Sequence, residues 1–455
     1  MMRAALRLVA LGSALLASTA AERVAAAQVP SPPASAATPA PAPAQAPAEG
    51  AFTEDQAIAI ALRRNLEVIS ARFAIEEAQV ERVAAGIYPN PVLSYTAGNV
   101  VVGTGNPQNE GLKPGPFSQL VQSIGVSEVI DVWAKRGARM HAADLGIEQQ
   151  RLLVEDVLRE IVLSVRAAFT DVVREQAEYQ AVSGIKTHYD ETSRLARARV
   201  RAGEISEAEG AKIELEGLKY QNAVIDAQME LDLARRKLAT LLAFASPADL
   251  PGTAVGSDTG APRTLPLLEP LLAQALRERP DLLAARKSQE VAEAELGAAR
   301  REGYPDPSIG LTYTHSEFAV SGDNPDSLAI TLAIPLPLFD RNQAGVARAR
   351  LDAKRSESDV RRAELRIRQD VAEAARRVQR AAAVLDVYEG GGMLDRAERA
   401  LKVAEASYKA GSISLLELLE AQRTFIETRM QYLESQDDYR KALAEVKHAV
   451  GEKLQ

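Results

Sequence analysis

Few residues of this 455-residue chain could do chemistry, and the clearest are two carboxylates near its carboxyl-terminal end. Glu417 and Glu420 lie three positions apart, so a helix there would place both on one face and could present paired negative charge to a cation. A pair of glutamates on a helix is more often ordinary solvated surface, and the residue types alone do not separate the two interpretations.

Several other kinds of chemistry are excluded by what the sequence lacks. The absence of cysteine removes disulfides, thiolate metal sites, thiol nucleophiles and a lipid-modified cysteine that could anchor the chain. The histidines are scattered without ligand-like spacing, at His141, His188, His315 and His448. We find no nucleophile–base constellation, phosphate loop or metal triad, so we predict that the protein is not an enzyme and needs no metal or cofactor.

Length and charge narrow the class of protein further. A net charge of −8 provides no basic patch for phosphates, so we expect no nucleic-acid partner. At 455 residues the chain exceeds one ordinary compact domain, which predicts either two domains or an elongated architecture.

The first fifty residues have the pattern of an export signal and a linker. Arg3 and Arg7 form a charged start. A short apolar stretch, Leu8–Ala17, comes next, and small residues follow it. We therefore predict a signal peptide over 1–27, cleaved near Ala25-Ala26-Ala27 or, alternatively, near Ser18-Thr19-Ala20. Residues 28–50 are rich in alanine and proline and predict an extended linker.

The remainder is a repeat of one long unit. Tyr88-Pro89-Asn90-Pro91 recurs as Tyr304-Pro305-Asp306-Pro307, a shift of 216 positions, and Arg201–Ser206 recurs as Lys409–Ser414, a shift of 208. The first half therefore carries eight more residues between these markers (216 − 208), which the loop Gly103–Phe117 could hold against Ala319–Ser327. Matching motifs in matching order indicate duplication of one structural unit.

Each unit has the same expected order of elements. We place the first unit at 51–243 and the second at 266–455, with a linker at 244–265. Each opens with a helix, at 53–86 and 266–302, that ends at the Tyr-Pro-x-Pro turn. Two strands follow, at about 91–102 and 118–130, then at about 307–318 and 328–336. A long helical hairpin completes each unit, at 134–242 and 341–449.

The strands and helices show distinct periods. In the second unit, Ile309, Leu311 and Tyr313 alternate with small or polar residues, which suits lipid on one face and a wet lumen on the other. Strands of a soluble sandwich would look alike, so that alternative stays open. The long helices carry a 3.5-residue seam typical of coiled coils, at Val154, Leu158, Ile161, Val165, Ala168 and Val172, and at Ile367, Val371, Ala374, Val378, Ala381, Leu385 and Tyr388.

Glycines punctuate these long helices at matching positions. Gly203 and Gly411 mark the hairpin tips. Gly184 and Gly392 each lie 19 residues before a tip glycine (203 − 184 and 411 − 392), and either a bend or simple tolerance of glycine could explain them.

With these features the chain resembles the TolC-type outer-membrane factors, the exit ducts of tripartite efflux and type I secretion systems. The resemblance covers residues 52 to about 450 and is carried by the duplicated unit, the two Tyr-Pro-x-Pro turns, the segment Trp133–Arg139 and, most strongly, Ala406–Gln422. Among relatives, the proline-rich leader and Trp133–Arg139 look most like the heavy-metal cation-efflux branch, of Czc and Cus type.

The resemblance implies a mainly helical fold with a membrane portion. Three copies would each give four strands to one 12-stranded outer-membrane β-barrel, and the helices would continue it as a long periplasmic tube. It also implies a periplasmic adaptor and an inner-membrane pump of the RND type as partners, in the outer membrane of a Gram-negative bacterium. The exported substrate would be divalent metal cations.

The resemblance also assigns roles to residues near the tips. Glu417 and Glu420 would line the constriction of the channel, six carboxylates in a trimer. Tyr408 and Glu209 would form a latch that holds the entrance shut, whereas the family's basic clamp position is occupied here by Ile413. The adaptor would contact the tips, namely Arg201, Ala202, Gly203, Glu204, Ile205 and Ser206 with Lys409, Ala410, Gly411, Ser412, Ile413 and Ser414.

Two other functions stay open at this point. The same fold could serve export of organic compounds or type I protein secretion. A protein of another class, a soluble periplasmic coiled-coil adaptor or scaffold, would share the long helical hairpins.

Overall fold

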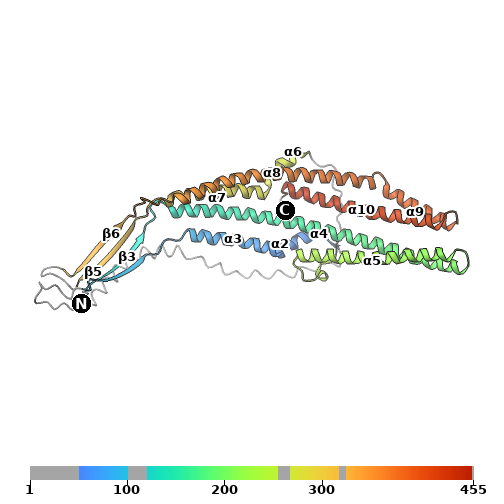
Figure 1. The fold of residues 1–455 in the computed structure, drawn as a ribbon, viewed down its shortest axis with the longest axis horizontal. Coiled ribbons are helices and arrows are strands. Elements are labelled where there is room, and N and C mark those ends of the chain that lie inside the picture. Colours follow the sequence, from blue (N-terminus) through green and yellow to red (C-terminus); the bar gives the residue numbers. More distant parts are fainter. Residues whose placement is uncertain (1–50, 101–119, 255–266, 317–323, 453–455) are drawn as a thin grey trace. The chain divides into compact units, whose positions relative to one another are not determined.

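The computed structural model describes residues 51–100, 120–254, 267–316 and 324–452 (Figure 1). The predicted signal peptide, the proline-rich linker and the expected insertion Gly103–Phe117 lie outside the described residues, as does the second half of the linker between the two units, 255–265. None of the helices in these described ranges combines the length and apolarity that a bilayer crossing requires.

Two copies of one unit follow each other along the chain. The first contains helices α2 (Glu54–Arg64) and α3 (Leu66–Ala85), strands β2 (Val92–Gly98) and β3 (Val121–Val129), and helices α4 (Lys135–Arg201) and α5 (Glu207–Leu241). The second contains helices α6 (Leu268–Glu278) and α7 (Pro280–Glu302), strands β5 (Ser308–Ser316) and β6 (Asp326–Ala333), and helices α8 (Gln343–Tyr388), α9 (Met393–Lys409) and α10 (Leu415–Val450). The duplicated helix–strand–strand–helix–helix order is confirmed.

Short elements close the base of the first hairpin. Strand β1 (Ala51–Phe52) pairs in parallel with β4 (Thr253–Ala254), and the one-turn 3₁₀ helix η1 (Pro247–Asp249) lies between α5 and β4. Phe52 is buried and meets the ring of Phe169 on α4 edge-on, at 5.7 Å between ring centres. This contact fixes the start of the folded chain to the long helix.

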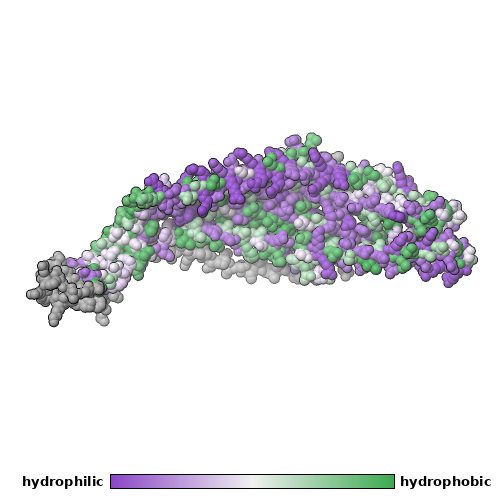
Figure 2. Space-filling view, in the orientation of Figure 1, coloured by the Kyte–Doolittle hydropathy of each residue, from purple (hydrophilic) through white to green (hydrophobic). Residues whose placement is uncertain are grey.

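The four longer strands form one antiparallel sheet in the order β2-β3-β5-β6, so strands of both units share it. Its two faces differ. Leu93, Val126, Leu311 and Ile330 lie side by side in one row, and the next row along the strands, on the other face, contains Ser94, Gly125, Thr312 and Ala329. The apolar row is exposed, with Ile330 at 80% of its full accessibility, and hydrophobic residues are visible over the sheet in Figure 2. The predicted alternation of faces is therefore present.

The predicted coiled-coil seams are buried. Ile161, Val165, Ala168 and Val172 of α4 pack with α2 and α5 in one core, and Ile367, Val371 and Val378 of α8 pack with α6 and α10 in a second. At 67 residues, α4 is about 100 Å long at 1.5 Å per residue. Each unit thus has its own core along its helices.

The sequence wrongly predicted one continuous opening helix in each unit. The helix breaks at Asn65 and at Arg279, where the backbone is extended. The Asn65 side chain accepts from the amides of Glu67 and Val68 and donates to the Leu241 carbonyl at 2.8 Å. Arg279 donates at 3.4 Å to the carbonyl of Ala449, which lies 208 positions after Leu241. In both units, then, the break residue satisfies a carbonyl at the end of the return helix.

The two interior glycines behave differently. Gly184 lies within the continuous helix α4, whereas Gly392 adopts φ +63° and separates α8 from α9. The proposed bend is therefore found in the second hairpin and not in the first. Around the break, the Tyr432 hydroxyl of α10 donates to Glu389 at 2.9 Å, so the interrupted helix stays attached to its partner.

We predict that Asn65→Ala will destabilise the protein by about 1–3 kcal/mol, because it removes a helix cap and leaves the Leu241 carbonyl without its donor. Asn65→Asp is the matched control, since it keeps the acceptor for the α3 amides and loses only the donor. The thermal midpoint of helix unfolding in detergent, followed by circular dichroism, should fall most for alanine. Equal midpoints for wild type and Asn65→Ala would contradict this role.

Candidate functional site

The free ends of the two hairpins are built by the same device. At each tip a glycine in the left-handed region ends the outgoing helix, Gly203 with φ +75° and Gly411 with φ +72°. The next amide, of Glu204 or Ser412, bonds back to the carbonyl five residues earlier at 2.9 Å. This pattern is a Schellman motif, which explains why glycine is needed at both positions.

The returning helices begin with matching capping boxes. The Ser206 amide donates to Glu209 Oε2 at 3.0 Å, and the Ser414 amide donates to Glu417 Oε2 at 2.9 Å, while each serine hydroxyl accepts from the glutamate amide. Glu209 and Glu417 therefore carry structural roles that the sequence analysis did not assign. The Ser-x-x-Glu spacing is the signal that could have revealed them.

Glu417 and Glu420 both lie on the first turns of α10 and both are exposed. Their three-residue spacing places them on one side of the helix, next to the tip. Capping uses one oxygen of Glu417 and leaves its negative charge in place, at the positive end of the helix dipole. The structure thus brings these two charges together at the tip within one chain.

Tyr408 joins the two hairpins through its ring. It packs against a cluster in which Ala196, Ile213 and Leu415 are buried, with Ile205 and Leu419 at its margin. Among the described residues, its hydroxyl makes no hydrogen bond to Glu209, whose carboxylate is held by Ser206 instead. The Tyr408–Glu209 latch is not formed in this chain and stays a prediction.

Charged residues join the hairpins again farther from the tips. Lys441 of α10 contacts both Asp437, at 2.7 Å, and Asp171 of α4, and Lys237 of α5 reaches Asp171 at 3.0 Å. Burial tends to raise the pKa of Asp171, but its two lysine partners hold it below the usual value. For Asp437, which is 5% exposed, burial outweighs Lys441 and raises the pKa. Sequence reasoning missed this joint because its members come from three helices.

A second buried joint surrounds Arg279, which is 3% exposed. Its guanidinium donates to both oxygens of Asp281, at 3.0 and 2.7 Å, and to Asp370 of α8 at 3.0 Å. Arg159 of α4, also buried, bonds Asp156 and the His448 carbonyl of α10 at 2.7 Å. The bonds of Arg279 tie the second unit's break to α8 and α10, and Arg159 ties α4 of the first unit to the same end of α10.

Comparison with known proteins decides the family. The model of the outer membrane efflux protein family matches residues 57–243 and 271–452, one match for each unit. The chain belongs to that family. Its members are outer-membrane channels that conduct substrates passively, so the chain is an outer-membrane efflux channel protein, and the predicted class of function is confirmed.

Individual relatives agree with this membership. The chain is 25% identical over 386 residues to the cobalt-zinc-cadmium resistance protein CzcC of Cupriavidus metallidurans, covering 85% of this chain and 87% of the relative. It is 24% identical over 395 residues to the pyoverdine export outer membrane protein OpmQ of Pseudomonas putida, covering 83% and 81%. The solved structure of CusC has the same fold, with a TM-score of 0.70, 19% identity, and coverage of 88% and 92%.

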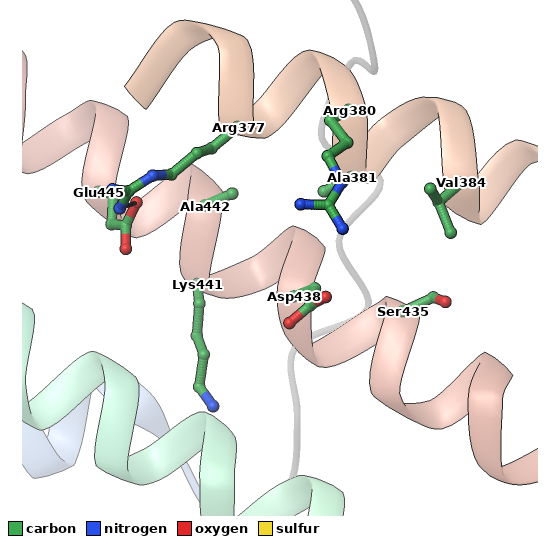
Figure 3. Close-up of a pocket in the computed structure, with 9 residues that line it drawn as sticks. All are labelled: Arg377, Arg380, Ala381, Val384, Ser435, Asp438, Lys441, Ala442 and Glu445. Atoms are coloured by element: carbon green, nitrogen blue, oxygen red, sulfur yellow. Dashed lines mark hydrogen bonds and ion pairs between the residues drawn. The ribbon is translucent and has the colours of Figure 1, made fainter. Parts of the chain in front are cut away.

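Two grooves lie on the surface of this efflux protein. One, between α8 and α10, is lined by charges of both signs, including Arg377, Arg380, Asp438 and Glu445 (Figure 3). Arg377 pairs with Glu445 at 2.9 Å, and Lys441 points away from them toward α4. The other lies on the first hairpin near its tip and is lined by Arg194, Arg197, Val200, Arg201, Glu207, Gly210, Ala211 and Glu214.

Three of the four histidines contact a carboxylate across two elements, which their spacing in the sequence did not reveal. The pairs are His188–Glu405 at 3.5 Å, His315–Asp326 at 2.7 Å and His448–Glu160 at 3.1 Å. No group of three or more metal-binding side chains forms within the described ranges.

We predict a specific acid sensitivity from Asp281. Burial tends to raise its pKa, but Arg279 outweighs burial and holds the pKa below the usual value of about 3.9. A depressed pKa gives stability that is present above the unfolded value and is lost as pH falls through the folded value. The midpoint difference between wild type and Asp281→Asn should therefore be constant from pH 5 to 8 and shrink below about pH 4. Glu357→Gln, on the exposed face of α8, is the control; an equally shrinking difference there would reject the assignment.

Proposed function

We propose that this protein is the outer-membrane exit duct of a tripartite efflux system that exports divalent metal cations. The observation that carries the metal assignment is the likeness to CzcC, a cobalt-zinc-cadmium resistance protein, along 85% of the chain. The exposed carboxylates at the hairpin tip support it, because negative charge at a narrow entrance favours cations. Transfer of the gene to a metal-sensitive host that lacks its own duct, with the matching adaptor and pump, should restore resistance.

The assembly we propose is a trimer whose sheets complete one wall. Strands β2 and β6 stand at the ends of the four-stranded sheet, and neither has a partner strand on its outer side among the described residues. In hydrocarbon such edges are too costly to leave open, so a lipid-embedded sheet has to close. Three copies would give twelve strands, with the exposed apolar face toward lipid and the small hydroxyl side chains toward the passage.

The placement of the chain follows from the same proposal. Its family resides in the outer membrane and extends into the periplasm. We propose that residues 1–27 direct export and are removed, and that no acyl anchor is attached because the chain has no cysteine. The hairpin tips would then face the periplasm and meet the adaptor's hairpins, with the inner-membrane pump beyond them.

The entrance would be guarded by Glu417 and Glu420 from three chains, six carboxylates in one ring. We predict that Glu417→Gln with Glu420→Gln weakens the cation preference of the channel in planar bilayers, as a shift of reversal potential toward zero in a salt gradient. Glutamine is a good capping-box residue, so the first change removes charge and keeps the helix start. Glu357→Gln together with Glu373→Gln, both exposed on helix α8, removes two carboxylates away from the tips and serves as the charge-matched control. Unchanged selectivity in the Glu417/Glu420 double variant would exclude the ring.

The entrance latch remains part of the proposal for the assembled channel. If Tyr408 and Glu209 bond in the closed trimer, Tyr408→Phe and Glu209→Gln should each raise single-channel conductance, and the two changes together should add little more. Phenylalanine retains the ring that packs at the tip, and glutamine retains the cap at Ser206. Conductance equal to wild type in both single variants would remove the latch from the mechanism. With Ile413 in place of a basic clamp, we expect one latch per chain.

Export of organic compounds is the second candidate, since the chain is nearly as similar to the pyoverdine export protein OpmQ. The two functions differ in a measurable way: cells with the complete system would resist organic toxins and remain sensitive to metals. Measuring the native mass in detergent distinguishes a metal duct or an organic-compound duct from a soluble adaptor, because either duct would be trimeric and would need detergent to stay in solution.

A further inference from the structure

Within the chain, the two units are clamped together where the helices meet the sheet. The indole of Trp133 stacks on Tyr304 at 4.8 Å between ring centres and donates to the Pro305 carbonyl at 2.9 Å. Lys135 donates to the Tyr304 carbonyl at 2.6 Å and to Asp306 at 2.7 Å. Segment 131–139 of the first unit thus grips the Tyr-Pro-x-Pro turn of the second.

A second ion pair extends this grip. Arg139 of α4 pairs with Glu302 at the end of α7 at 2.7 Å, and Arg301 donates to the Ala134 carbonyl at 3.1 Å. The clamp covers much of what it touches, because Lys135 is 7% exposed and Pro305, Asp306 and Pro307 are at least partly buried. We call this arrangement the internal clamp.

The duplicated unit contains the same two parts again, but they are less covered. The turn Tyr88-Pro89-Asn90-Pro91 is exposed at all four residues, whereas in its counterpart only Tyr304 is exposed and the other three are partly buried. Segment 335–347 contains the counterpart of the gripping segment, residues 339–347 at a shift of 208. It carries exposed apolar side chains at Leu336, Leu338 and Phe339, the last at 92%. Arg136 of the same chain lies over the Tyr88 ring, 4.3 Å from its centre, and donates to the Gly86 carbonyl. Within the described residues, however, no segment holds this turn as segment 131–139 holds its counterpart.

The residues at these two surfaces have changed together. A shift of 208 maps Lys135 onto Gln343, and a shift of 216 maps Asp306 onto Asn90, so the ion pair becomes a pair of amides. The same shifts turn the pair Arg139–Glu302 into Ala347 and Gly86, where both charges are lost. Trp133 on Tyr304 becomes Arg341 and Tyr88, whose ring carries Arg136 of its own chain on one face and could take a second cation on the other. Each change on one surface has a matching change on the other, which is expected of surfaces that touch.

The order of the strands also indicates that these two surfaces meet between copies. The internal clamp stands beside the pairing of β3 with β5, and the equivalents of these strands are β6 and β2, the two ends of the sheet. Within the hairpins, Leu332 of β6 pairs with Ile309 as Val126 of β3 pairs with Leu93, and Tyr95 of β2 corresponds to Leu311 at a shift of 216. Transferring the internal pairing of Val126 with Leu311 therefore puts Leu332 opposite Tyr95, with both on the apolar face. Within one sheet the two end strands cannot meet, so their partners lie in another copy.

We propose that segment 335–347 of one copy clamps the Tyr88-Pro89-Asn90-Pro91 turn of a second copy, with Gln343 against Asn90, Arg341 against Tyr88 and Ala347 against Gly86. The inference rests on the trimer of the proposed function and assigns its contact residues. The joint inside each chain is held by ion pairs, whereas the three residue pairs proposed between copies contain no ion pair and a single charge, that of Arg341. Copies can therefore meet without first desolvating opposed charges.

The absence of native cysteine makes a clean test possible. The double variant Gln343→Cys with Asn90→Cys, purified as the full-length protein in detergent, is treated with a short bis-maleimide reagent. We expect covalent dimers and trimers on denaturing gels, and none from either single variant. The control Arg139→Cys with Glu302→Cys places a neighbouring pair of the internal clamp inside one chain, so the reagent should link it without producing dimers.

Native mass of the same samples separates the two possible failures. A trimer that yields no cross-linked oligomers from the Gln343–Asn90 pair would overturn the assigned contact and leave the trimer intact. A monomer in detergent would overturn the trimer itself, and with it the proposed function.

A charge exchange gives an independent measurement if the cysteine pair fails to fold. Gln343→Lys with Asn90→Asp rebuilds, between copies, the ion pair of the internal clamp. We expect each single variant to lower the temperature at which the trimer dissociates and the double variant to recover that loss. Strictly additive shifts would mean that the two residues do not touch.

Discussion

The ends of the helices impose the constraint on which the rest of this structure depends. A helix leaves four amides and four carbonyls without internal partners, and a chain made of long helical hairpins has many such ends close to surfaces that pack. At the tips, glycine motifs and capping boxes satisfy them locally. At the opposite end of each return helix, a side chain from the unit's first helix does so, Asn65 in one unit and Arg279 in the other.

This constraint explains why the opening helix of each unit is broken. Asn65 can reach the Leu241 carbonyl and cap α3 only because its own backbone leaves the helical region. Arg279 solves the same problem with a longer, charged side chain, and its charge then requires Asp281 and Asp370. One geometric requirement has thus produced a neutral joint in the first unit and a buried ion network in the second.

The sequence predicted what depends on period and repetition. The 3.5-residue seams, the tip glycines and the duplicated turns are local patterns, and each was found where it was expected. The helix breaks, the joint of Asp171 with Lys441 and two of the histidine–carboxylate pairs depend on which helices pack together, and the third pair, His315 with Asp326, depends on strand register. Spacing along the chain does not specify either. Gly184 and Gly392 show the limit of prediction from the repeat. They occupy equal positions in the two units, but Gly184 lies within a helix and Gly392 lies in a left-handed turn.

The candidate site shows how structure and charge share the same residues. Glu209 and Glu417 occupy the third position of their helices because a capping box needs a carboxylate or an amide there. Their charges consequently arrive at the tips as a result of folding, whatever passes between them. Glu420 has no such structural bond among the described residues and is exposed, so its charge is the one that folding does not explain. If the entrance prefers cations, a role in that preference would account for the negative charge at Glu420, which helix capping does not explain.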